Sequence, residues 1–235
     1  MNKESIRIVG VMVLVAALFG SVVSGIYLGS QETLERNQRI RLQRAKVEVF
    51  SLGDTEKLSP EEITALVDRR VVTAETVVDP ETGQEFEVLR AYADDERTQL
   101  QGIGFNFRGL GFWAPIEGIL ALKPDLSRTL DIVILQQQET PGLGGRIEET
   151  DFTNQFRYDP DKAGLDGLLV SPPAKAAKYI QISATPPPSD SPMRERHVDA
   201  LSGATQTCMA MERILNEHLA QFQRAMAAQG KAERR

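Results

Sequence analysis

Cysteine and histidine are scarce in this chain of 235 residues, which contains only Cys208, His197 and His218. A single cysteine excludes an intrachain disulfide, a CxxC metal site and a CxxC redox pair. Two histidines exclude a three-histidine metal site. We therefore expect no metal-ligating residue, and any redox chemistry would need an organic cofactor or another subunit.

Several familiar motifs are also missing. The chain has no G-x-x-x-x-G-K-[S/T] P-loop, no G-x-G-x-x-G and no G-x-S-x-G. A hydrolase pair of Ser202 with His197 is the remaining alternative for acyl chemistry, but proximity in sequence does not establish geometry. The net charge is −6, and no basic cluster lies beside aromatic residues, so nucleic acid is not an expected partner.

One long hydrophobic run is present, from Ile8 to Leu28, and it contains no charged residue. As a helix rising about 1.5 Å per residue it would reach about 31 Å, enough to cross a bilayer core. A signal peptide cleaved near Val22-Val23-Ser24 is the alternative, although its apolar region would be shorter. We therefore predict a transmembrane anchor over residues 1–29.

The charges that flank this run do not orient it. Lys3 and Arg7 precede it and favour a cytoplasmic N-terminus. Five basic residues follow within about 20 positions and favour the opposite orientation: Arg36, Arg39, Arg41, Arg44 and Lys46. Charge counting alone does not place the soluble domain.

The rest of the chain predicts an α+β fold, an antiparallel sheet flanked by helices. A helix should continue from the anchor to about residue 50, and Ser59 with Pro60 is typical of a helix start. Segment 76–83 should be a strand end and turn. Strands are predicted over 85–92, 100–107, 116–122 and 129–135, a short helix over 150–156 and a possible strand over 178–183.

The last helix should begin near Ala204. Its apolar positions recur every three or four residues, which predicts a buried face: Cys208, Met211, Leu215, Leu219 and Phe222. Cys208 fits this face better than a reactive thiol. Arg194-Glu195-Arg196 should be a solvated run, with a phosphate contact from one arginine as the alternative.

The segment from Asp199 to Thr207, DALSGATQT, opens onto this helix and carries three hydroxyl groups. A helix start offers unpaired backbone N–H groups and the positive end of the helix dipole, which suits a phosphate. Gly203 and Ala204 would let the phosphate approach the backbone. The alternative is a plain helix start with Ser202 as the N-cap.

Two further segments stand out. Gln138 to Gly145, QETPGLGG, follows an apolar strand, and its glycines and proline predict an unusual loop. Gly109 to Trp113, GLGFW, contains the only tryptophan of the chain, whose simplest alternative role is core packing.

Together the three segments resemble the FMN-binding domain family. In the flavinylation motif of that family, the Thr or Ser at the position of Thr207 carries FMN through a phosphoester. The resemblance implies that four neighbours and the leading aspartate surround this attachment: Ser202, Gly203, Ala204, Thr205 and Asp199. It further implies that the flavin is lined by Glu139, Thr140, Gly142, Leu143 and Gly144, with Trp113 close by.

A single anchor joined to one such domain is similar to the covalent-flavin subunits of two membrane complexes, Rnf and Nqr. The resemblance implies an extracytoplasmic domain at the inner membrane, attachment of FMN from FAD by a magnesium-dependent flavin transferase, and electron transfer among subunits of an ion-translocating oxidoreductase. No catalytic residue or independent substrate site is then expected. The alternatives are a stand-alone flavin reductase or sensor, or a flavin-free anchored interaction protein.

The expected organisation has four parts. Residues 1–29 form the anchor, and residues 30–100 form a helical stalk and the N-terminal part of the soluble domain. Residues 101–228 form the FMN-binding domain, and residues 229–235 form a polar tail.

Overall fold

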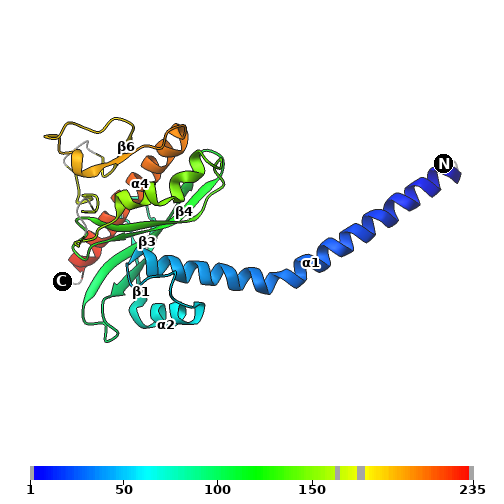
Figure 1. Cartoon of the computed structure of the whole chain (residues 1–235), viewed down its shortest axis with the longest axis horizontal. Helices are drawn as coiled ribbons and strands as arrows, with labels where there is room; N and C mark the ends of the chain where they lie inside the picture. The colour runs from blue at the N-terminus through cyan, green and yellow to red at the C-terminus, as the bar shows by residue number, and fades with distance from the viewer. Residues whose placement is uncertain (1–2, 162–164, 174–177, 233–235) are drawn as a thin grey trace. The chain divides into compact units, whose positions relative to one another are not determined.

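The computed structural model describes residues 3–161, 165–173 and 178–232 (Figure 1). Two compact units divide the chain, residues 1–41 and residues 42–235. Helix α1 (Lys3–Val49) makes up the first unit and enters the second with its last turns. The predicted continuation of the apolar segment into a helix up to about residue 50 is confirmed.

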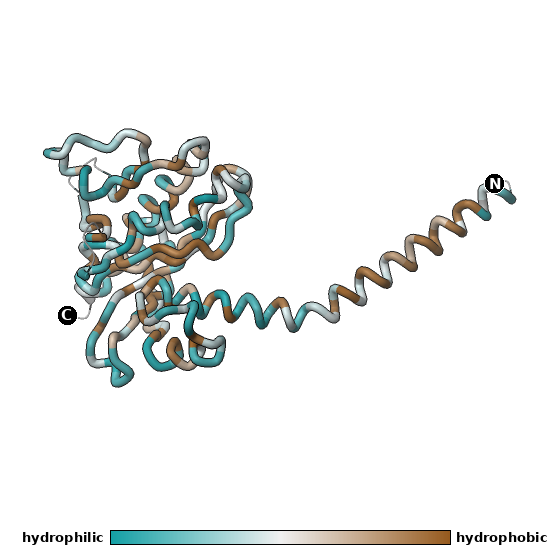
Figure 2. The backbone as a smooth tube through the Cα atoms, viewed as in Figure 1, coloured by the Kyte–Doolittle hydropathy of each residue, from teal (hydrophilic) through white to brown (hydrophobic). Residues whose placement is uncertain are grey.

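Helix α1 is, among the described residues, the one helix long and apolar enough to cross a membrane. Its apolar residues are concentrated in its N-terminal part, as the colouring in Figure 2 shows. These side chains are exposed; Leu14 and Leu28, for example, are 68% and 67% exposed. An apolar helix with no protein surface against it is suited to a lipid environment, although a signal sequence shares these properties.

The second unit is built on a five-stranded antiparallel sheet in the order β1-β2-β3-β4-β5. Each strand pairs with the next along the chain, so that short turns suffice to connect them. The strands are β1 (Val71–Val78), β2 (Glu85–Tyr92), β3 (Leu100–Leu110), β4 (Pro115–Leu122) and β5 (Thr129–Gln136). The four predicted strands and the α+β class are confirmed, and β3 extends three residues further than expected.

Alternate residues of the sheet enter two separate cores. On β4, Leu120 and Leu122 pack in the core formed with helix α4 (Thr205–Ala232). Ile119 and Ala121 face the opposite core, which includes Phe50 from the end of α1. Both cores exclude water because side chains alternate along a strand. Helix α4 therefore covers one face of the sheet (Figure 1).

Helix α2 (Pro60–Arg70) begins as the sequence predicts. Ser59 is its N-cap, and Ser59 and Glu62 form a reciprocal capping box. Helix α2 adds Ile63 and Val67 to the core that contains Phe50. This arrangement gives the sheet helical cover on its second face as well.

The segment between β5 and α4 is mostly irregular. It contains the 3-10 turn η1 (Gly144–Glu148), α3 (Thr150–Thr153), η2 (Asn154–Phe156) and η3 (Arg194–Arg196). Strands β6 (Gln181–Ser183) and β7 (His197–Asp199) pair in parallel. The helix predicted over 150–156 is confirmed, whereas the strand predicted over 178–183 is shorter, since only its last three residues pair.

Two expectations in the C-terminal half are wrong. The polar tail should begin at residue 229, but α4 continues to Ala232, and residues 233–235 lie outside the described residues. Arg196 should lie in a solvated run, yet it is 7% exposed. Its guanidinium donates to the carbonyls of Leu169, Ser171 and Tyr179, so it is occupied in holding loops together.

Candidate functional site

The three segments singled out in the sequence meet around Thr207. Its hydroxyl donates a 2.6 Å hydrogen bond to Oε2 of Glu139. Thr207 lies in the first turn of α4, and Glu139 follows β5. Both side chains are buried, at 3% and 4% exposure. The flavinylation-like segment and the ETPGLGG segment are thus joined by a direct bond between their polar groups.

The other oxygen of Glu139 binds the third segment. Oε1 accepts hydrogen bonds from the backbone N–H of Phe112 at 2.9 Å and of Trp113 at 3.0 Å. Glu139 itself is held by its backbone N–H, which donates to Oε1 of Gln137 at 2.6 Å. A buried carboxylate is costly unless hydrogen-bonded, and three donors meet this one.

Two glycines make this approach possible. A Cβ at Gly111 would lie 2.6 Å from Oε1 of Glu139, and a Cβ at Gly144 would lie 2.3 Å from Oγ1 of Thr207. Any side chain at either position would displace the polar pair. Gly111 was not predicted as a site residue; its place in the GLGFW segment was the available signal.

The helix start has the features expected of an anion site. The first intrahelical bond of α4 runs from the Cys208 N–H to the Ala204 carbonyl at 2.9 Å. The N–H groups of Thr205, Gln206 and Thr207 therefore precede the hydrogen-bonded ladder, and the helix dipole adds positive potential there. Because α4 begins at Thr205, Ser202 lies ahead of the capping position, and the plain N-cap alternative is wrong.

The hydroxyls of the motif differ in their surroundings. Ser202 and Thr205 are exposed, whereas Thr207 is buried. Gly203 adopts φ +77°, a conformation that glycine adopts readily, and a Cβ there would lie 2.9 Å from the Leu143 side chain. The turn before α4 therefore packs against the ETPGLGG loop.

Exposed apolar side chains gather on the segments that converge here. Leu110, Phe112 and Trp113 are 63%, 53% and 67% exposed, and Leu143 and Met209 are 43% and 61% exposed. The rings of Phe112 and Trp113 contact each other edge to face at 4.9 Å. Core packing, the alternative role for Trp113, is excluded. Side chains of this kind are suited to covering a planar aromatic ligand.

Asp199, the leading residue of the motif, presents its carboxylate to solvent, with its side chain 74% exposed. Its backbone is held by Gln155, whose amide oxygen accepts from the Asp199 N–H at 2.6 Å. His197 Nε2 lies 3.0 Å from Ser183 Oγ and 3.1 Å from the Ser183 carbonyl oxygen. His197 therefore serves Ser183, and the hydrolase pair with Ser202 is wrong.

Cys208 is 2% exposed and belongs to the core, as its position in the apolar stripe predicts. Burial raises the pKa of its thiol, which disfavours the reactive thiolate. The reactive-thiol alternative is therefore not supported.

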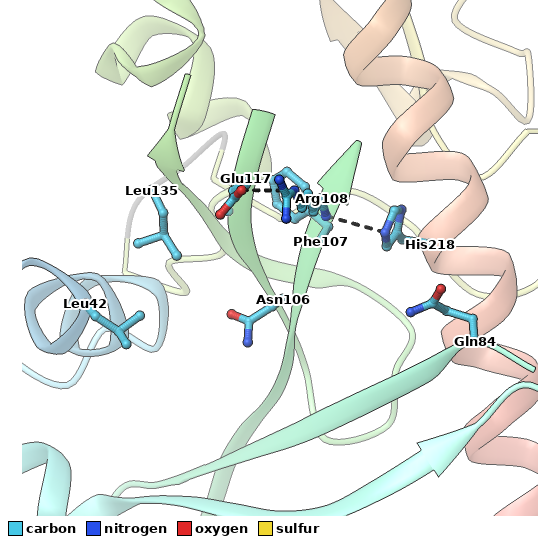
Figure 3. A pocket seen from close by; sticks show the side chains of 9 residues that line it. Leu42, Gln84, Asn106, Phe107, Arg108, Glu117, Leu135 and His218 are labelled. Carbon is cyan, nitrogen blue, oxygen red and sulfur yellow. Dashed lines mark hydrogen bonds and ion pairs between the residues drawn. The ribbon is translucent and has the colours of Figure 1, made fainter. Parts of the chain in front are cut away.

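A separate cavity of about 530 Å³ opens beside β3 and β4 (Figure 3). Arg108 and Glu117 pair with each other there at 3.0 Å. The His218 ring donates to the Ile214 carbonyl at 2.8 Å and accepts from the Arg108 N–H at 3.4 Å. These polar groups already satisfy one another, and none of the predicted site residues lines the cavity.

Comparison with known families decides what this arrangement is. Residues 111–220 match the family model described as the FMN-binding domain. The chain belongs to the FMN-binding domain family. The match begins at Gly111 and encloses Glu139 and Thr207, so the bonded polar pair lies inside the FMN-binding domain. Among the described residues, no group of three potential ligands is placed to hold a metal ion.

Curated relatives carry one name, that of the C-type subunit (NqrC) of the Na(+)-translocating NADH-quinone reductase. The chain is 31% identical over 133 residues to the Chlamydia trachomatis protein of this name, covering 53% of this chain and 40% of that protein. The chain thus spans about two fifths of the length of the chlamydial relatives that it matches. The Pseudomonas aeruginosa protein of the same name is 26% identical, with 92% of each chain covered.

Solved structures share the fold of this FMN-binding domain. Shewanella oneidensis NqrC aligns with a TM-score of 0.52 at 18% identity, covering 77% of this chain and 91% of that one. The corresponding reductase subunit from Parabacteroides distasonis aligns with a TM-score of 0.56 at 18% identity, covering 82% of this chain and 95% of that one. At this identity the likeness establishes the architecture alone.

Proposed function

We propose that this chain is a membrane-anchored electron-transfer subunit that carries FMN through a phosphoester to Thr207. The observation that carries the proposal is the position of Thr207. It lies in the first turn of α4, and its hydroxyl meets the ETPGLGG and GLGFW segments through Glu139. Of the three motif hydroxyls, this is the one that the other two segments enclose.

The chain offers suitable groups for each part of FMN. The N–H groups that open α4 suit the phosphate, next to Gly203 and Ala204. Leu143, Phe112 and Trp113 provide exposed apolar surface for the ring, and Thr140, Gly142 and Gly144 shape the loop beside it. Bound FMN supplies one-electron and two-electron chemistry, and the surrounding residues orient it and set its polarity.

The names of the relatives support a place in an Nqr-type complex, with the Rnf-type complex as the alternative that the same motifs serve. The partners would be other subunits of that membrane complex and a flavin transferase. Residues 1–29 would anchor the chain in the inner membrane, with residues 101–228 on the extracytoplasmic side. A covalent link would retain the cofactor where lost FMN is not readily replaced.

The first test is the intact mass of the full chain after co-expression with a flavin transferase. We expect a gain equal to FMN minus water, mapped by peptide sequencing to Thr207. Thr207→Ala should abolish the gain, whereas Thr205→Ala, which removes an exposed hydroxyl of the same helical turn, should retain it.

The outcomes separate the alternatives. Modification at Thr205 or Ser202 would move the attachment site. An unmodified chain, with the transferase active on a control substrate, would favour the flavin-free interaction protein. A modified chain that co-purifies with no membrane subunit would favour the stand-alone reductase or sensor.

A further inference from the structure

We propose that Glu139 is the general base for its own chain's flavinylation, accepting the proton of the Thr207 hydroxyl as that oxygen attacks the flavin donor. The inference rests on the proposed function, because it concerns the step that loads the cofactor. It assigns to this chain a part of the chemistry that would otherwise fall entirely to the transferase.

The hydrogen bond has the direction that such a step needs. Thr207 Oγ1 donates to Glu139 Oε2 at 2.6 Å, within the reach required of a general base. Oε1 of the same carboxylate is occupied by the N–H groups of Phe112 and Trp113. Oε2 is therefore the oxygen that remains for the hydroxyl, and a carboxylate that accepts every one of these bonds is in the form able to take a proton.

The carboxylate is fixed from the side away from the loop. Its Oε1 is anchored by the 112–113 backbone, and its backbone N–H is anchored by Gln137. Gly144, in contrast, lies against Thr207 Oγ1 from within the 140–145 loop. Because Thr207 is 3% exposed, a phosphorus atom can reach Oγ1 only after this loop moves. Such a movement can leave the anchors of Glu139 in place.

The chemical step balances with a flavin dinucleotide as donor. The bond between Thr207 Oγ1 and the FMN phosphorus forms, and the bond between that phosphorus and the AMP oxygen breaks. AMP leaves, and the hydroxyl proton passes to Oε2 of Glu139. Without an acceptor, a threonine hydroxyl is a weak nucleophile, and a positioned base typically contributes about 100-fold or more to such a step.

The test measures the rate of covalent flavin attachment to the full chain by purified transferase with FAD and Mg²⁺, by intact mass over time. Glu139→Gln keeps an oxygen for the Phe112 and Trp113 N–H groups but replaces Oε2 with an NH₂ group. We expect attachment to slow by about 100-fold or more. The matched control is Glu149→Gln, since Glu149 is an exposed carboxylate nearby that pairs with Arg146.

The dependence on pH distinguishes proton transfer from simple positioning. If Glu139 is the base, the ratio of the Glu139→Gln rate to the wild-type rate should rise with pH, because hydroxide increasingly replaces the missing base. A ratio that does not change with pH would overturn the proposal, as would attachment at the wild-type rate. Titrating groups of the transferase act equally on both proteins and cancel in the ratio.

A second variant keeps the test decisive if Glu139→Gln does not fold. Glu139→Asp retains the charge and withdraws the carboxylate by one methylene, so we expect an intermediate rate; a wild-type rate would contradict the inference. Failure of the wild-type chain to accept flavin at all would instead overturn the proposed function. Modification of Thr207 that is equally fast in the Glu139 variants overturns the inference alone.

Discussion

At the residue scale, the buried polar contact between Thr207 and Glu139 depends on the absence of a side chain at Gly144. The two groups are 68 positions apart in sequence and are enclosed together. Polar groups enclosed in this way stabilise a structure only while each keeps its partner. A small steric change beside them should therefore affect both stability and flavin attachment.

Gly144→Ala provides that change. Its Cβ would lie 2.3 Å from Thr207 Oγ1 and 3.0 Å from Glu139 Cβ, so the polar pair must separate. We expect the free energy of unfolding to fall by about 1–3 kcal/mol, as overpacking usually costs. Urea denaturation of the detergent-solubilised chain would measure this loss, and covalent flavin attachment should slow in parallel.

Gly145→Ala is the matched control for this substitution. Its Cβ would meet nothing closer than 3.4 Å, and its backbone φ is not positive. We expect stability and flavin attachment close to those of the wild type. An equal effect of both substitutions would show that the loop backbone, and not the enclosed pair, responds to the added methyl group.

At the scale of elements, one buried ion pair joins the β1–β2 turn to α4. Asp79 is fully buried, and its carboxylate accepts bonds from Nε and Nη2 of Arg224 at 2.9 and 2.6 Å. Thr82 adds a third donor at 2.6 Å. The hydrogen bonds from Arg224 hold the pKa of Asp79 well below its usual range. The hairpin and the helix that carries Thr207 are thereby fastened together.

Asp79→Asn should loosen this connection. Loss of charge-assisted bonds typically costs about 1–3 kcal/mol, which urea denaturation at neutral pH would detect. The control is Glu81→Gln, because Glu81 meets Arg224 at 3.3 Å but is 67% exposed and should contribute little. Equal stability of Asp79→Asn and the wild type would contradict the assignment.

The pair also predicts a dependence on acid. A carboxyl whose folded pKa is depressed contributes its full stability above its unfolded pKa, about 3.9. That contribution should be lost as the pH falls below this value toward the depressed folded pKa. The stability difference between the wild type and Asp79→Asn should therefore narrow in strong acid, as denaturation curves at several pH values would show.

At the scale of the whole molecule, the apolar part of α1 predicts attachment to a membrane. The full chain with a C-terminal tag should remain in the membrane fraction after carbonate extraction, and sequencing of the mature protein should find the apolar N-terminal segment of Figure 2 intact. Release into the soluble fraction with an N-terminus after Ser24 would identify a cleaved signal peptide instead.

The side of the membrane can be read with paired C-terminal fusions. An extracytoplasmic domain predicts an active alkaline phosphatase fusion and a dark green fluorescent protein fusion, and the reverse pattern would place the domain in the cytoplasm. The basic residues on both sides of the apolar run make this measurement necessary, since they favour opposite orientations.

Much of the architecture could be predicted from local pattern. The alternation in 116–122 became β4 with two buried faces, and the three-to-four spacing from Cys208 to Phe222 became the buried side of α4. These patterns report the period of the backbone itself, so they identify elements without knowledge of distant partners. The strand expected over 178–183 was longer than the one found because pairing depends on the neighbouring strand.

By itself the sequence determined the elements, the apolar run and the three segments that carry the family resemblance. Only the tertiary structure decided that Thr207 is bonded to Glu139, that Phe112 and Trp113 are exposed, and that Arg196 is buried. The physical reason is that burial and hydrogen bonding depend on which loops pack together. Such contacts join residues far apart in the chain, where no local period records them.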